Sequence, residues 1–498
     1  MIFKFLKAVH STALQRAVSL CSQLVLKQIL SLSKGAKRLA LWSTVLWTSL
    51  IFTAMTNMTY DQAYEMLGEV GQQHLLDNWE NLTDEKQKQF LNDIASIDTS
   101  IFKEQKAILN QQTKKDLKIE VFDQFSISGN VDDYEKGLKA ISEGKVGCLL
   151  IAGGQGTRFR STAPKGLFPV SVIKNKSLFQ LFAEKTAAAS KQADRPLSLA
   201  IMTSPLNHDE TVSYFKKNNY FGLQPGQVSF FTQSMLPFLD ANGNMLLDQN
   251  DKLAKGPDGN GFSLYHFYHS GIWKEWQKNG IKHVNYVLID NPLADPFDAE
   301  LMGFHIRQND EITLKSVERI DPMEKVGVII RNGGKAGVIE YSEISKEDAL
   351  AKDANGYLKH RCANISLFCF NMLFIEKAAH QQLTLHTALK SLSNDNPVKI
   401  WKFERFIFDL LPYADKVSAL VYPRELCFAP LKNVEGQDSL ETVQKALLNL
   451  DRITFKRISG LDAEGKTFEL SQDFHYPTKE LLSNWKGKPL PDESYINP

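Results

Sequence analysis

From residue 145 onward, short apolar runs alternate with stretches of helical pattern, and this alternation constrains the fold more than any other feature of the chain. The apolar runs are KVGCLLIA (145–152), LSLAIMTS (197–204), VSFFTQ (228–233), HVNYVLID (283–290), EITLKSVE (311–318), KVGVIIRN (325–332) and ANISLFCF (363–370). Helical patterns fill several of the gaps, as in residues 178–193. Such alternation predicts an α/β fold with a mostly parallel sheet covered by helices. Ligands on sheets of this kind bind at the carboxyl ends of strands, so the residues that follow each run are candidate site residues.

The pattern divides the chain into four regions. Residues 1–58 form an extension, residues 59–140 are expected to be helical, and residues 141–400 carry the sheet. Residues 401–498 are expected to form a small β-rich C-terminal domain, because the sequence KRISGLDAEGKTFEL favours one or two hairpins.

The extension allows three interpretations. Residues 39–60 are uncharged and follow three basic residues, which is the pattern of a membrane segment with a cytoplasmic basic flank. Met55 and Met58 stand just before the first soluble helix, so the start of the chain is alternatively mis-assigned and residues 1–57 are not translated. The third interpretation is an amphipathic extension. The protein is therefore expected in the cytoplasm, or at a membrane only if residues 39–60 are a genuine segment.

The charge balance excludes one class of partner. The formal net charge is +1, but the first sixty residues hold seven Lys and Arg and no acidic residue, which leaves 51 basic against 57 acidic residues in the body. A mildly acidic body argues against a nucleic-acid backbone as partner. The five cysteines include no CxxC pair and suit buried thiols in a reducing compartment.

A glycine-rich loop follows the first strand. In GGQGTRFRSTAPKG (153–166), Gly153, Gly154 and Gly156 let the backbone approach a phosphate with its N–H groups turned inward. Arg158 follows closely, and Lys165 stands in a Pro-Lys-Gly triplet. These residue types together indicate a phosphate-binding loop with two cations.

Two better-known phosphate loops do not match this sequence. A dinucleotide-binding G-x-G-x-x-G would need a third glycine where Phe159 stands, and a P-loop would need a Gly-Lys-Ser/Thr triplet, which is absent here. The remaining interpretation is a loop for a nucleoside triphosphate without a Walker lysine. Neither a zinc spacing nor a G-x-S-x-G elbow is present elsewhere in the sequence.

The GGQGTR and PKG motifs, with further blocks in the same order, resemble the eukaryotic-type UDP-sugar pyrophosphorylases, which make UDP-glucose and UDP-N-acetylglucosamine. The other blocks are MTSP (202–205), FFTQSMLPFLD (230–240), KGPDGNG (255–261), IDNPLADP (289–296), VIEYSEI (338–344), ANISLFCFN (363–371), FERFIFDLLPYA (403–414) and FAPLKN (428–433). The resemblance covers roughly residues 65–450. It implies a Rossmann-like nucleotidyltransferase fold of the GT-A type, with residues 141–400 as the nucleotide- and sugar-binding catalytic domain.

The same resemblance implies a uridylyltransferase that joins UTP to a sugar 1-phosphate and releases pyrophosphate. The attacking sugar-phosphate oxygen is already an anion, so catalysis needs positioning and charge neutralisation rather than a general base. The resemblance gives Arg158 and Lys165 the role of gripping the triphosphate.

Further roles follow from the family's pattern. The nucleotide-binding residues are expected to be Gly153, Gly154, Gly156, Thr157, Gln233 and Gly259. The substrate-binding residues are expected to be Asn260, Glu340, Asn364, Lys402 and Lys432. Gln233 would read the uracil edge, and Asp290 would hold Mg²⁺, which needs only one or two protein carboxylates besides phosphate oxygens and water. The loop after Asp290 looks shorter than in the family, which puts a contact by Asp295 in doubt.

The expected sugar is N-acetylglucosamine 1-phosphate, because VIEYSEI, ANIS and the FERFIFDLLPYA stretch look closer to that branch of the family. Asn364 could bond the acetamido group, and the small Ala363 and Ser366 could leave room for it. Three alternatives stay open at the level of sequence: glucose 1-phosphate as the substrate, a different nucleoside triphosphate, and a catalytically silent protein that binds nucleotide sugars.

Overall fold

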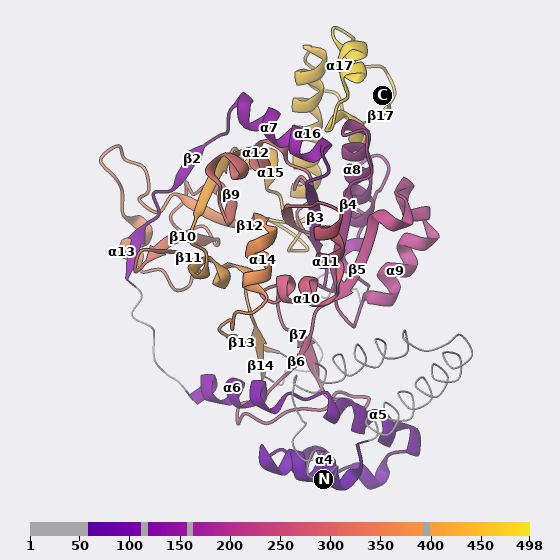
Figure 1. The fold of residues 1–498 in the computed structure, drawn as a ribbon, viewed down its shortest axis with the longest axis vertical. Coiled ribbons are helices and arrows are strands. Elements are labelled where there is room, and N and C mark those ends of the chain that lie inside the picture. The colour runs from indigo at the N-terminus through magenta and orange to yellow at the C-terminus, as the bar shows by residue number, and fades with distance from the viewer. Residues whose placement is uncertain (1–57, 111–117, 157–162, 392–398) are drawn as a thin grey trace, which may run out of the picture. The chain divides into compact units, whose positions relative to one another are not determined.

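The structure is a computed structural model that describes residues 58–110, 118–156, 163–391 and 399–498 (Figure 1). It divides into two compact units. Unit 1 holds the described residues up to Lys103 together with Asn244–Ala254, and unit 2 holds Glu104–Gly243 and Lys255–Pro498. Residues 39–57 of the uncharged N-terminal stretch lie outside the described residues. Among the residues that the structure describes, no helix is long and apolar enough to cross a membrane.

The elements are labelled as in Figure 1. The helices are α4 (Tyr60–Glu69), α5 (Asp84–Ala95), α6 (Thr99–Asn110), α7 (Val131–Ser142), α8 (Leu178–Gln192), α9 (His208–Lys217), α10 (Ser263–His269), α11 (Ile272–Lys278), α12 (Ala299–Gln308), α13 (Lys346–Leu350), α14 (Met372–Ala378), α15 (Arg424–Cys427), α16 (Leu440–Ser459) and α17 (Lys479–Trp485). The strands of the large sheet are β1 (Ile119–Val121), β2 (Phe125–Ile127), β3 (Val146–Ile151), β4 (Ser198–Thr203), β5 (Val228–Thr232), β8 (His283–Leu288), β9 (Ile312–Glu318), β10 (Gly327–Asn332), β11 (Lys335–Ile339), β12 (Cys362–Asn371) and β15 (Val417–Tyr422). Three two-stranded pairs are β6 (Met235–Pro237) with β7 (Lys255–Pro257), β13 (His386–Ser391) with β14 (Lys399–Glu404), and β16 (Glu469–Leu470) with β17 (Tyr495–Ile496).

Unit 1 is built on the helices α4 and α5. Thr59 and Gln62 form a capping box at the start of α4, since the Thr59 side chain accepts from the Gln62 N–H and the Gln62 side chain accepts from the Thr59 N–H. Thr83 caps α5, since its side chain accepts from the Lys86 N–H. The first described helix therefore has its own start signal at Thr59.

The sheet of unit 2 is large and mixed, and its strands run mostly in one direction. Its main path has the order β2-β15-β9-β12-β8-β3-β4-β5, and β10 joins β12 to β11 and β1. Along that path every pair is parallel except the two pairs made by β12. The carboxyl ends of β3, β4, β5 and β8 therefore meet at one edge. The seven predicted apolar runs are all strands of this sheet, so the predicted α/β architecture is confirmed.

Both faces of the sheet are covered, because successive residues of a strand point to opposite faces. Cys148 and Leu150 of β3 enter a core packed with residues of α8 and α12, whereas Leu149 and Ile151 enter a second core packed with residues of α10, α11 and α14. This explains why β3 contains no polar side chain.

The helices α7 and α12 touch backbone to backbone. A Cβ on Gly303 would fall 1.7 Å from the carbonyl oxygen of Asp133, so no larger residue fits at that position. The Asp133 carboxylate also receives two hydrogen bonds from Arg307, of 2.6 and 2.9 Å. This contact joins a helix before the first sheet run to one after the fourth.

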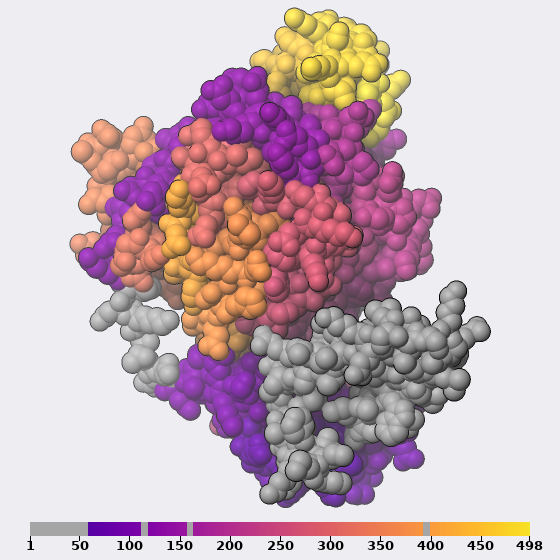
Figure 2. Space-filling model, viewed as in Figure 1, coloured from indigo at the N-terminus to yellow at the C-terminus, as the bar shows by residue number. Residues whose placement is uncertain are grey.

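The structure differs from the sequence-based expectation at two places. The stretch expected to be helical up to residue 140 also contains β1 and β2, which pair with β10 and β15 of the main sheet. The hairpins expected around residues 455–470 are absent from the structure: α16 runs to Ser459, Gly460 ends it with φ 79°, and the short strands β16 and β17 are parallel. Phe455 and Ile458 lie on the buried face of α16, so their spacing is helical, and Gly460 is a helix C-cap rather than a hairpin turn. In Figure 2 this yellow C-terminal segment lies against the purple and magenta residues of unit 2.

Candidate active site

The glycine loop leaves β3 at the carboxyl edge of the sheet. Its base is closed by two backbone hydrogen bonds, from the Gly156 N–H to the Ala163 oxygen (3.2 Å) and from the Lys165 N–H to the Gly154 oxygen (3.3 Å). Gly153 is buried, whereas Gly154 is exposed and a Cβ there would meet nothing within 4 Å. Thr157 and Arg158 lie outside the described residues.

Gly153 and Gln233 are in direct contact. A Cβ on Gly153 would fall 2.1 Å from Gln233 Nε2, so only glycine leaves room for this amide. Gln233 follows β5, and its N–H donates to the carbonyl oxygen of Thr203 at the end of β4 (2.9 Å). The structure thus brings the predicted uracil-reading residue against the predicted phosphate loop.

Lys165 and Asp290 form the charged pair of the site. Lys165 Nζ lies 3.6 Å from Asp290 Oδ2, and both side chains are partly exposed, at 15% and 19%. Lys165 follows the glycine loop of β3, and Asp290 follows the adjacent parallel strand β8. The pair results from the sheet topology, because neighbouring parallel strands deliver their next residues to the same edge.

Lys432 is tied to this pair through the backbone. The Leu431 N–H donates to the Asp290 carbonyl oxygen (2.7 Å), and the Lys432 N–H donates to the Asp438 oxygen (2.7 Å). Burial raises the pKa of the Asp438 carboxyl, Lys432 and Arg424 act to lower it, and Asp290 raises it further. The Asp438 carboxyl is therefore within electrostatic range of Lys432, Arg424 and Asp290.

Glu340 and Asn364 meet near Gly327. A Cβ on Gly327 would lie 3.6 Å from Glu340 Oε1 and 3.7 Å from Asn364 Cβ. A β-bulge in β12 follows Asn364, and within it Ser366 has φ 56°, a left-handed conformation that is unusual for serine. The Ser366 N–H donates to Asn364 Oδ1 (3.1 Å), so the Asn364 amide nitrogen is oriented away from this bond. Strained backbone next to a polar side chain is typical of functional sites.

A second group of charges faces Glu340. Burial raises the pKa of the Glu340 carboxyl, Glu343 raises it further, and His386 and Lys432 oppose the rise. His386 Nε2 lies 2.8 Å from Asp409 Oδ2, and although burial lowers the pKa of His386, this carboxylate raises it above its ordinary value. Sequence analysis missed His386 and Asp409, which are brought to Glu340 only by the tertiary fold.

Gly259 and Asn260 form a loop pressed against the segment after β14. Gly259 has φ 90°, and a Cβ there would fall 2.3 Å from the Arg405 carbonyl oxygen. Asn260 Oδ1 accepts from the Ile407 N–H (3.0 Å), so part of this side chain serves the loop's own structure. Lys402 lies on β14, and its ammonium group binds Glu404 Oε1 at 2.7 Å. The Lys402 ammonium is therefore paired with a carboxylate of its own strand.

Two further polar groups near the site were missed in the sequence. Asn207 donates to the carbonyl oxygens of Ala152 (3.1 Å) and Gly154 (3.3 Å) and so braces the glycine loop. The buried Asp258 accepts from Ser234 Oγ, and it thereby joins the residue after Gln233 to the residue before Gly259. Asn207 stands just after the MTSP block and Asp258 lies within KGPDGNG. Their closeness to these blocks was the available signal in the sequence.

Asp295 faces the protein interior rather than the site. Its carboxylate accepts from the Tyr476 hydroxyl and from the Phe297 N–H (2.8 Å). Burial raises the pKa of this carboxyl, and the negative charge of Asp298 raises it further. The doubt about Asp295 as a substrate contact is therefore consistent with its structural partners.

Fold and site together define a nucleotidyltransferase of the sugar-nucleotide type. The family model described as UTP–glucose-1-phosphate uridylyltransferase matches residues 87–469. UDP-N-acetylglucosamine pyrophosphorylase of Saccharomyces cerevisiae is 32% identical over 84% of this chain and 96% of its own length. UDP-N-acetylglucosamine diphosphorylase 2 of Arabidopsis thaliana is 34% identical over 78% and 83%.

One solved structure extends this likeness to the fold. The uridine diphosphate N-acetylglucosamine pyrophosphorylase of Trypanosoma brucei, solved with an inhibitor, superposes with a TM-score of 0.72 at 26% identity and covers 89% of this chain and 99% of that chain. The chain belongs to the UTP–glucose-1-phosphate uridylyltransferase family and is a UDP-sugar pyrophosphorylase.

Proposed function

We propose that this enzyme transfers the uridylyl group of UTP to N-acetylglucosamine 1-phosphate, with Mg²⁺ held at Asp290. The observation that carries the site assignment is the Lys165–Asp290 pair at the carboxyl edge of β3 and β8, 3.6 Å apart and beside the glycine loop. The named relatives act on the same sugar, which supports the choice of substrate.

The reaction is an in-line displacement at the α-phosphorus of UTP. A phosphate oxygen of the sugar 1-phosphate forms the new P–O bond, the bond to the β-phosphate oxygen breaks, and pyrophosphate leaves with that oxygen. The nucleophile carries its own negative charge, so the protein must orient the two anions and offset their repulsion. Lys165, which follows the glycine loop, would orient the phosphates and offset their repulsion. Arg158 is assigned the same role.

The residues present fit a magnesium site. Among the described residues no group of three or more His, Cys, Asp or Glu side chains stands ready to hold a metal by itself. Magnesium in nucleotide sites needs only one or two carboxylates, with phosphate oxygens and water as the other ligands. Asp290, partly exposed at the carboxyl edge of the sheet, is suited to be that carboxylate. When bound, the ion would neutralise charge on the phosphates.

The other residues have roles in recognition. Gln233 carries an amide that can both donate to and accept from the uracil edge. Asn364 can donate its amide nitrogen to the acetyl oxygen, because its oxygen is already engaged by Ser366. Glu340 would accept a sugar hydroxyl. Lys402 would have to exchange Glu404 for a substrate phosphate.

Pyrophosphate release tests the proposal directly. We would assay the four common nucleoside triphosphates with N-acetylglucosamine 1-phosphate and with glucose 1-phosphate. We expect turnover with UTP, a higher kcat/KM for the N-acetylated sugar, and some activity with glucose 1-phosphate, because a pocket with room for an acetamido group rejects a smaller hydroxyl only weakly. A clear preference for glucose 1-phosphate would contradict the assignment of the sugar.

The four reduced, buried cysteines of the described residues support a cytoplasmic location.

A further inference from the structure

The loop of residues 290–295, here called the Asp290 loop, is gripped from its inner side by two distant side chains. Lys185 of α8 donates from Nζ to the carbonyl oxygens of Pro292 (2.6 Å) and Ala294 (2.8 Å). Tyr476 donates its hydroxyl to the Asp295 carboxylate. The loop thus receives a buried ammonium at its centre and a phenol at its end.

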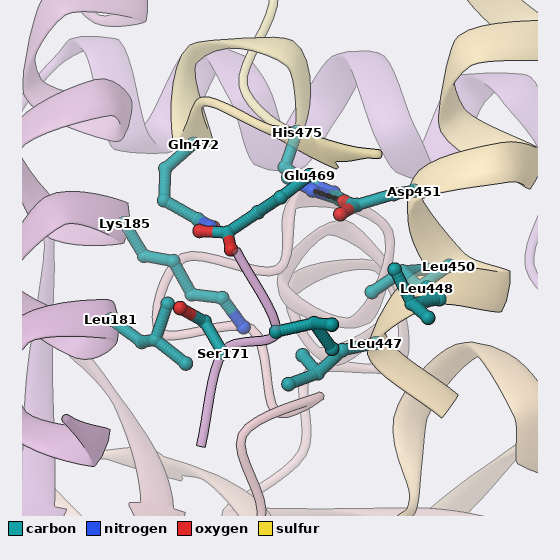
Figure 3. A pocket seen from close by; sticks show the side chains of 11 residues that line it. Ser171, Leu181, Lys185, Leu447, Leu448, Leu450, Asp451, Glu469, Gln472 and His475 are labelled. Carbon is teal, nitrogen blue, oxygen red and sulfur yellow. Dashed lines mark hydrogen bonds and ion pairs between the residues drawn. The ribbon is translucent and has the colours of Figure 1, made fainter. Parts of the chain in front are cut away.

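The grip lies beside the C-terminal segment. Lys185 is 5% exposed, and its side chain enters a cavity of about 20 Å³ whose opposite wall is the C-terminal segment (Figure 3). Asp451 of α16 contacts His475 (2.9 Å), the residue before Tyr476, and so fixes the turn that carries the phenol. Burial lowers the pKa of Lys185 to about 8, and the carboxylates of Asp295 and Asp451 oppose that effect.

Burial of the Lys185 ammonium costs hydration free energy, and packing alone does not account for a charged group at this position. An ammonium group that is paired with carbonyl oxygens rather than with a carboxylate loses hydration free energy on burial that no ion pair offsets. An apolar side chain of similar length would fill the same space without that loss. What the ammonium supplies and an apolar side chain cannot is the pair of hydrogen bonds to two carbonyl groups, which fix the backbone just after Asp290.

We propose that Lys185 and Tyr476 are positioning residues of the reaction, which hold the Asp290 loop so that the Asp290 carboxylate is presented to the metal in one orientation. The inference rests on the proposed metal role of Asp290. It makes residues 440–498, which carry none of the assigned substrate or metal contacts, part of the catalytic apparatus. Partners that orient metal ligands typically change metal affinity or activity by about 10–100-fold when they are removed.

The test is a set of substitutions read by metal binding as well as by activity. Lys185→Met removes the donor and keeps the length, and Tyr476→Phe removes only the hydroxyl. Lys176→Met is the matched control, because Lys176 is also buried (4% exposed) but its hydrogen bonds go to Glu184 and Tyr495. The affinity for Mn²⁺ in the presence of UTP is measured by electron paramagnetic resonance of the free ion, alongside kcat, KM and Tm.

We expect Lys185→Met to weaken Mn²⁺ binding by about tenfold and to lower kcat by a similar factor. The KM for the sugar phosphate should stay unchanged, and Tm should not fall below that of Lys176→Met. Tyr476→Phe should act in the same direction to a smaller extent, and it decides the question if Lys185→Met does not fold. Folded variants with wild-type Mn²⁺ affinity and kcat would overturn the inference.

Asp290→Asn separates this inference from the assignment on which it rests. If Asp290→Asn loses Mn²⁺ affinity while the folded Lys185 and Tyr476 variants keep it, the positioning role is wrong and the metal role of Asp290 stands. If Asp290→Asn binds Mn²⁺ as the wild type does, the metal role is wrong and the inference fails with it.

Discussion

Lys165 Nζ and Asp290 Oδ2 lie 3.6 Å apart, although 125 positions separate the two residues in the sequence. Their strands, β3 and β8, are adjacent and parallel, so the backbone brings the two charges together before any ligand binds. In this arrangement the ammonium can exchange the carboxylate for a substrate phosphate, and the carboxylate can exchange the ammonium for a metal ion. The proposed binding of a highly charged substrate would use this existing pair of charges.

The first prediction concerns Lys165. Lys165→Ala should lower kcat by about 100-fold or more, as loss of a preorganised donor does elsewhere. The fold should persist, because the side chain is partly exposed at the edge of a loop. Steady-state kinetics and a thermal unfolding curve check both points. Near-normal turnover in the purified variant would remove Lys165 from the catalytic machinery.

The second prediction uses the contact between Gly153 and Gln233. In Gly153→Ala the new methyl group would fall 2.1 Å from Gln233 Nε2, so the flexible glutamine side chain must move away. We expect KM for UTP to rise about tenfold, the size of effect produced by losing one or two hydrogen bonds, while KM for the sugar phosphate changes little. Gly226→Ala is the control, because a Cβ there meets nothing within 4 Å. Equal KM values for UTP in the two variants would contradict the assigned role of Gln233.

The third prediction concerns selection of the sugar. Asn364→Ala removes the amide expected to bind the acetyl oxygen, and the ratio of kcat/KM for N-acetylglucosamine 1-phosphate to that for glucose 1-phosphate should fall by about tenfold. A ratio that stays constant while both values drop would mean that Asn364 supports the bulge at Ser366 rather than the acetyl group.

The fourth prediction is a dependence of stability on pH through His305. Burial, and then the charge of His283, lower the pKa of His305 to about 3 from the usual 6.5. Below pH 6.5 the unfolded chain therefore binds a proton that the folded protein refuses, so stability falls as the pH drops from about 6.5 to about 3 and is unaffected above that range. Each unit of pKa difference corresponds to about 1.4 kcal/mol.

His305→Leu should flatten this decline. Thr313, which bonds His305 at 2.8 Å, keeps Asp310 as an acceptor at 2.7 Å, so the substitution leaves its hydroxyl satisfied. Urea unfolding between pH 4 and pH 8 measures the slope. The same slope in wild type and variant would show that His305 is not the group responsible.

The fifth prediction concerns the N-terminal extension. A chain beginning at Met58 should keep full activity, because the start signal of α4 lies in Thr59 and Gln62 and none of the site motifs precedes them. Activity of the shortened chain is compared with that of the full chain at equal concentration. An inactive, folded short chain would assign residues 1–57 a role in catalysis.

Local patterns predicted much of the fold and pointed to part of the candidate site. The apolar runs predicted the strands because a buried parallel strand needs an unbroken apolar sequence. Asp290 became a candidate metal ligand because it ends such a run. The glycine loop was recognisable because three glycines stand within four positions directly after an apolar run.

The remainder depends on which distant segments meet, and no local pattern encodes that. Lys185 looks like an ordinary lysine of an amphipathic helix, and only the fold places it against Pro292 and Ala294. The C-terminal segment was misjudged because Gly460 ends a helix and was interpreted as a turn between strands.

The position of β15 between β2 and β9 has a consequence for synthesis of the protein. Because β15 is the one strand that β2 pairs with in the described part of the chain, the ribosome must make most of the chain before this edge of the sheet can close. At ordinary elongation rates β2 waits on the order of tens of seconds for its partner. During that interval the nascent chain exposes an unsatisfied strand, which is where a chaperone would be expected to bind and where premature termination would leave an aggregation-prone fragment.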